Sequence, residues 1–95
     1  MKRDDFIWTI GYQDDTAIVD GPARKRLKNR SPEELLQEGM YRAAFCAAVY
    51  DGTEEEFLPR FVERTGINAD SVAYLQRLYG VFGVPDGVRK VSVIG

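Results

Sequence analysis

The stretch DFIWTIGYQDDTAIVD, residues 5–20, decides the fold class of this chain. Its alternate apolar residues fall on one face of an extended chain: Phe6, Trp8, Ile10 and Tyr12. A period of two with aromatic and β-branched residues predicts a strand, and Asp14 and Asp15 then suit a short turn. The segment TAIVD that follows is again β-prone, so we predict an N-terminal β-hairpin. Because a lone hairpin is marginally stable, we expect its aromatic face to pack on further elements.

Three helices are predicted after the hairpin. Ser31 and Glu34 form a capping box that opens the first helix, and Asp51-Gly52 closes it. Gly66 separates the second helix from the third, whose N-cap we expect at Asn68. Residues 58–77 therefore have the layout of a helix-turn-helix.

A last strand is predicted from the alternation in VRKVSVI, residues 88–94. Since the other strands are N-terminal, we expect this strand to return to the hairpin in one small antiparallel or mixed sheet. The expected fold is thus α+β, a small single domain over residues 1–95. It has an N-terminal β-hairpin, three helices of which the second and third are arranged like a helix-turn-helix, and a C-terminal strand that returns to the hairpin.

The composition argues against an enzyme. The chain has 95 residues, no histidine and a single cysteine, Cys46, in apolar surroundings. It therefore lacks the commonest general base and metal ligand, a zinc ligand set and any Ser–His or Cys–His pair. We expect no catalytic, cofactor-binding or metal-binding residues, and a packing role for Cys46. With no apolar run of roughly 20 residues, we expect no membrane contact and a cytoplasmic location.

The segment AAFCAAVY, residues 43–50, is apolar on every side. A helix of this kind is buried all round, either as the centre of a small fold or against another chain. Under the second interpretation, Tyr41, Ala44 and Ala48 are the residues that we expect near a contact between two copies.

A basic run is the strongest charged feature. Five residues carry it: Arg24, Lys25, Arg26, Lys28 and Arg30. Such a run is usually solvated, and otherwise contacts an acidic partner, either nucleic acid or the acidic part of a second copy. Residues 1–30 carry a net charge of +2 and residues 31–95 a net charge of −4.

Two function classes follow from these patterns. We predict a small non-enzymatic protein-interaction or regulatory module that binds protein, most simply as a homo-oligomer. The alternative is a nucleic-acid-binding module that uses residues 58–77, with Asn68, Tyr74 and Arg77 toward the bases, together with the basic segment 24–30. The net charge of −2 across residues 53–80 opposes phosphate contacts and favours the first class.

Overall fold

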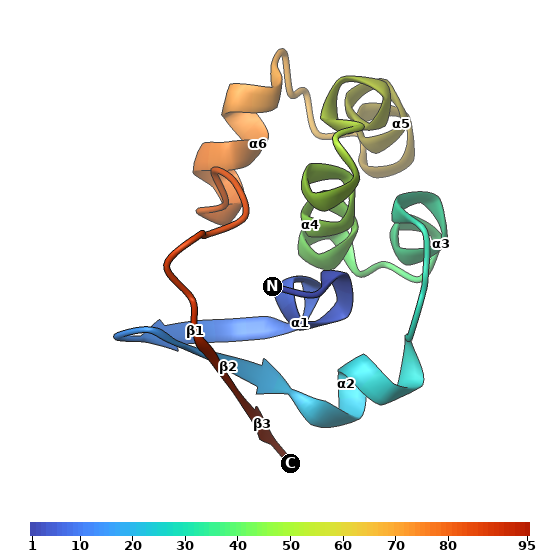
Figure 1. The fold of residues 1–95 in the computed structure, drawn as a ribbon. Helices are drawn as coiled ribbons and strands as arrows, with labels where there is room; N and C mark the ends of the chain where they lie inside the picture. The colour runs from blue at the N-terminus through green and yellow to red at the C-terminus, as the bar shows by residue number, and fades with distance from the viewer. The chain divides into compact units, whose positions relative to one another are not determined.

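A computed structural model describes all residues, 1–95. The chain is α+β and divides into two compact units, shown with their elements in Figure 1. Residues 1–30 with 84–95 form the sheet unit, and residues 31–83 form the helical unit. Both chain ends belong to the sheet unit. The expectation of a single domain stays a prediction.

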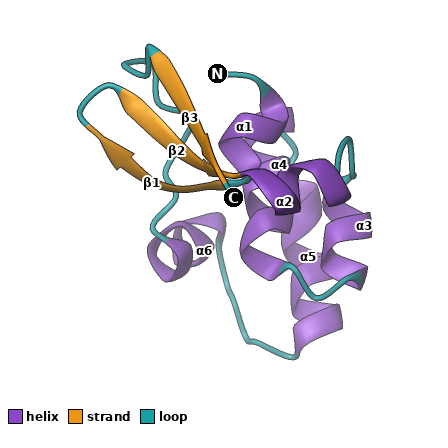
Figure 2. Ribbon diagram, turned by 90° about the horizontal axis from the view of Figure 1, so that it is seen from below, coloured by secondary structure: helices purple, strands orange, loops and turns teal.

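The sheet unit contains three strands and two short helices. In chain order these are α1 (Arg3–Ile7), β1 (Thr9–Gln13), β2 (Thr16–Asp20), α2 (Gly21–Arg26) and β3 (Lys90–Ile94). The strand order is β1-β2-β3, with β1 antiparallel and β3 parallel to β2 (Figure 2). The N-terminal hairpin and the returning C-terminal strand are thus confirmed, in a mixed sheet. Parallel neighbours need a long crossover, and here it contains α2 and the whole helical unit.

The first predicted strand begins too early. Residues from Arg3 to Ile7 form a short helix, and β1 starts only at Thr9. Four consecutive residues, Phe6 to Thr9, are buried, which a strand covered on one face does not allow. Asp4 and Asp5 lie in the first helical turn, where a negative charge is favourable.

The predicted aromatic face of the hairpin is therefore divided. Phe6 and Trp8 are buried in and after the helix, but Ile10 and Tyr12 are exposed on β1. The register of β1 against β2 shifts between Thr9 and Gly11, as in a β-bulge. Such a shift places residues on faces that strict alternation does not predict.

The helical unit consists of four helices: α3 (Pro32–Gln37), α4 (Tyr41–Asp51), α5 (Glu54–Thr65) and α6 (Val72–Tyr79). The capping box of Ser31 with Glu34 is present at the start of α3, as predicted. Gly52 and Gly66 end α4 and α5 as predicted, and both adopt left-handed conformations there, which the sequence predicts for Gly52.

The chain has six helices where the sequence predicts three. Besides the two short helices of the sheet unit, the first predicted helix is broken at Gly39, whose φ is +78°. Glycine adopts this left-handed conformation without steric cost, so the chain can turn there. The third predicted helix starts later than expected. Its N-cap is Ser71, whose Oγ accepts from the Tyr74 N–H at 3.2 Å, rather than Asn68.

Aromatic rings fill the interior of the helical unit. Phe61 is fully buried and lies 5.9 Å from Phe57 and 6.3 Å from both Tyr41 and Tyr79, measured between ring centroids. Phe45, also fully buried, joins the cluster through Phe57 and Tyr79. These distances are within the range in which aromatic pairs are favourable. The cluster joins α4, α5 and α6 into one packed core.

Candidate functional site: the basic cleft and the exposed strand

The sheet unit has a cleft of about 670 Å³ between its two short helices. Its lining is strongly basic: Lys2, Arg3, Asp4, Asp5, Gly21, Arg24, Lys25, Lys28, Asn29 and Val93. The basic run 24–30 supplies three of these side chains, Arg24 and Lys25 from α2 and Lys28 from the segment that follows it. The sequence-based prediction missed Lys2 and Arg3, because their proximity to α2 depends on how the chain folds back.

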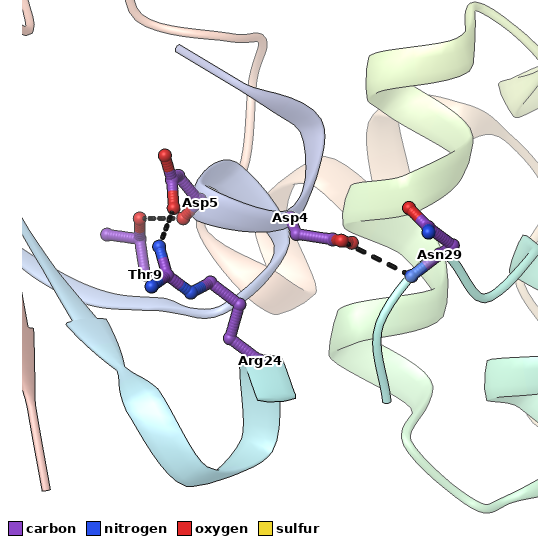
Figure 3. A network of polar contacts seen from close by, with 5 residues as sticks. All are labelled: Asp4, Asp5, Thr9, Arg24 and Asn29. Atoms are coloured by element: carbon purple, nitrogen blue, oxygen red, sulfur yellow. Dashed lines mark hydrogen bonds and ion pairs between the residues drawn. The ribbon is translucent and has the colours of Figure 1, made fainter. Parts of the chain in front are cut away.

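A small polar network holds the two sides of this cleft together (Figure 3). The Arg24 guanidinium pairs with the buried carboxylate of Asp5, and the Thr9 hydroxyl donates to the Asp5 carbonyl oxygen at 2.5 Å. The Asn29 N–H donates to Asp4 Oδ2 at 3.2 Å. Arg24 therefore has a structural partner, and its charge is largely matched by Asp5. The cations that remain for an external anion are best supplied by Lys2, Lys25 and Lys28.

The other basic residues predicted for partner binding lie outside this cleft. Arg26 is exposed and Arg30 is half-buried, and neither lines the cleft. The structure thus brings together three of the five predicted cations, Arg24, Lys25 and Lys28.

The residues of α4 that were predicted to contact a second copy do not form a free surface. Ala44 and Ala48 are fully buried within the chain, and Tyr41 is half-buried against Phe61. Residues 43–48 of the apolar helix are therefore covered by this chain's own residues, whereas Tyr50 is exposed. A contact with a second copy must be made by other residues.

The helix-turn-helix candidates are only partly on the surface. Asn68 and Arg77 are exposed and Tyr74 is half-buried. Six residues, 66–71, connect α5 to α6, more than the three or four of a DNA-binding turn.

Most arginines of the helical unit already have partners within it. Arg60 pairs with Glu33, Arg64 donates to the Gln37 carbonyl oxygen at 3.2 Å, and Arg42 donates to that of Tyr79 at 3.4 Å. The unit has four arginines against nine Asp and Glu, a net charge of −5. The sheet unit has nine Lys and Arg against six Asp, a net charge of +3. Anion binding is therefore favoured in the sheet unit.

Strand β3 is a second candidate surface. It is an edge strand, and all five of its residues are exposed. One row of paired residues crosses the sheet from Tyr12 through Ala17 to Val91. Ala17 is 0% exposed, whereas Tyr12 is 48% and Val91 is 40% exposed. Apolar residues therefore remain on the surface at both edges of the sheet.

The thiol of Cys46 has the environment predicted for a packing residue. It is buried, and burial raises the pKa of Cys46, with the charge of Arg42 opposing the shift. A raised pKa keeps the thiol protonated near neutral pH and weakens it as a nucleophile. No group of three or more His, Cys, Asp or Glu side chains is placed to hold a metal ion. None of the helices combines the length and the apolar character that a membrane span needs.

Comparison of the chain with models of known protein families, with curated proteins and with solved structures finds no match.

Proposed function

We propose that this chain is a small non-enzymatic protein-interaction module that associates with a second copy of itself. The observation that carries the proposal is the exposure of β3, an edge strand with three large apolar residues, Val91, Val93 and Ile94, in water. Single exposed apolar residues are ordinary on protein surfaces. Neighbouring ones on an unpaired sheet edge are typical of interaction sites.

The proposal of a non-enzymatic role rests on the chemistry of the side chains. The chain has no histidine, and its only thiol is buried with a raised pKa. The carboxylate of Asp5 is held by Arg24 in a structural contact. These features leave little for acid–base or nucleophilic catalysis and favour a binding role.

A second candidate function is nucleic-acid binding, and the basic cleft favours it. Lys2, Lys25 and Lys28 could contact phosphates. Under this candidate the sheet unit supplies the affinity, and Asn68, Tyr74 and Arg77 of the anionic helical unit contribute little. Fluorescence anisotropy of a labelled DNA duplex at about 0.15 M salt tests it. Sub-micromolar binding that Lys25→Glu with Lys28→Glu abolishes would make this candidate the better one.

Light scattering after size exclusion tests the first candidate. At tens of micromolar, a range that reveals micromolar affinities, the mass should approach that of two chains. The double variant Lys25→Glu, Lys28→Glu is the matched control, because it changes the cleft and leaves β3 intact, and it should keep the same mass. A single-chain mass over the whole concentration range would contradict the proposal.

A further inference from the structure

The two edges of the sheet are protected to different degrees. Strand β1 carries the register shift between Thr9 and Gly11, and a bulge of this kind makes an edge hard to extend. Strand β3 has no such shift. Its five residues, from Lys90 to Ile94, pair in continuous register with β2, and none is proline. The edge that is open to a further strand is therefore the outer side of β3.

The register of β3 places its side chains on defined faces. Val91 and Val93 pair with Ala17 and Val19, and therefore lie on the face where those two residues are fully buried. Ser92 pairs with Ile18 on the opposite face. An added strand would extend both faces, and the valine face would gain most of the apolar contact.

The charges of β3 and β2 select the direction of such a strand. A parallel second copy in register would place Lys90 beside the Lys90 of its partner, and like charges directly opposite are unfavourable. An antiparallel copy centred on Ser92 places Lys90 beside Ile94 of the partner instead. Since Ile94 pairs with Asp20 on β2, each lysine then shares a row and a face with an aspartate of the other copy. The antiparallel arrangement thus avoids the like-charge pair and is complementary in charge.

We propose that two copies of this chain associate edge to edge through antiparallel β3 strands, with a two-fold axis at Ser92. The inference rests on the proposed self-association and names its surface, direction and register. In this arrangement Val91 of one copy faces Val93 of the other, and the two sheets become one continuous sheet. The contact is isologous, so it closes as a dimer without leaving β3 open for further growth.

Disulfide trapping tests this register. With the axis at Ser92, the Cα atoms of the two copies of residue 92 lie directly opposite, about 4.5–5.5 Å apart, within the range that a disulfide spans. The variant Ser92→Cys should therefore convert under mild oxidation to a species of twice the mass, which reductant reverses.

The matched control is Val91→Cys. Two copies of residue 91 are then diagonal neighbours about 7–8 Å apart, too far for a bridge. A mixture of Val91→Cys and Val93→Cys chains should instead give the mixed disulfide, because these positions face each other. The parent chain should not cross-link, since its only cysteine, Cys46, is buried.

The outcomes separate the register from self-association itself. Efficient cross-linking of Ser92→Cys, with none for Val91→Cys, supports the two-fold axis at Ser92. A dimer by light scattering whose Ser92→Cys variant does not cross-link overturns this register and leaves self-association standing. A monomeric parent chain overturns both.

Discussion

Replacing Phe61 with alanine should remove much of the stability of the helical unit. The ring is 0% exposed and lies within 6.3 Å of three other aromatic rings, those of Tyr41, Phe57 and Tyr79. Truncating a buried phenylalanine costs about 3–5 kcal/mol, and each lost ring pair adds about 0.5–1.5 kcal/mol beyond its area. Since such terms are not fully additive, we expect a loss of about 4–5 kcal/mol. The free energy of unfolding of the whole chain is expected to be about 5–15 kcal/mol, so the variant should be close to unfolding.

Urea denaturation followed by far-ultraviolet circular dichroism measures this loss. Phe82→Ala is the matched control, because Phe82 is 68% exposed and its truncation should change the free energy of unfolding by less than about 0.5 kcal/mol. If Phe61→Ala does not fold, Phe61→Leu should still fold and cost about 1–2 kcal/mol through the lost ring contacts. A cost below about 1 kcal/mol for Phe61→Ala would refute the aromatic core described above.

Three further perturbations follow from the structure. Gly21→Ala should lower the free energy of unfolding by about 1–3 kcal/mol in thermal unfolding, because the new Cβ would lie 2.7 Å from the Ile94 carbonyl oxygen. Gly11→Ala is the control, since its Cβ meets nothing within 4 Å, and equal costs for the two variants would contradict this crowding. Ser92→Lys should make the chain monomeric by light scattering, because it brings two like charges together at the two-fold axis, whereas Ser92→Thr should keep the dimer. A dimeric Ser92→Lys variant would argue against an axis at residue 92. Burial raises the pKa of Cys46 and of Tyr79, and the nearby Tyr41 adds to the shift at Tyr79. Their contribution to the free energy of unfolding is therefore full below about pH 8.5–10 and is lost as the pH rises through the folded pKa values. The melting temperature should therefore fall between pH 8 and 11, and a flat profile would contradict the shifts.

Local signals in the sequence predicted the parts of the fold that depend on neighbouring residues. The capping box at Ser31 and the glycine ends at Gly52 and Gly66 need only residues within one helical turn, and the structure confirms them. The turn at Asp14 is of the same kind, with a left-handed φ of 55°. The hairpin and the returning strand were also predicted, because alternation marks strands and a lone strand requires a partner.

The errors arose where two local structures fit the same residues. The run from Phe6 to Tyr12 alternates like a strand, but its first residues form a helical turn in which consecutive side chains are buried. The helix expected from Ser31 to Asp51 is broken at Gly39, since a glycine within a helical pattern can be tolerated or can end the helix. Only tertiary packing decides such cases.

The candidate site depends on contacts between distant parts of the chain. The basic run 24–30 is visible in the sequence, but its association with Lys2 and Arg3 follows from the position of α1 beside α2. Likewise, the sequence does not reveal that β3 pairs in parallel with β2 and leaves its other side open. Residues 43–48 are buried as their apolar character predicts, whereas Val49 is half-buried and Tyr50 is exposed. The neighbours of the buried residues, however, are supplied by the same chain, and most of the exposed large apolar residues, three of which lie on β3, are found elsewhere.

Sedimentation equilibrium of the parent chain at low and high salt tests the central claim most directly. The proposed contact is mostly apolar and joins two sheet units that each carry a net charge of +3, so salt should screen this net repulsion more than the attraction between Lys90 and Asp20 of the two copies. Between about 0.05 and 0.5 M salt, the account predicts a monomer–dimer equilibrium whose dissociation constant stays constant or decreases. A monomer at every concentration, or a dimer that dissociates as salt is added, would contradict it.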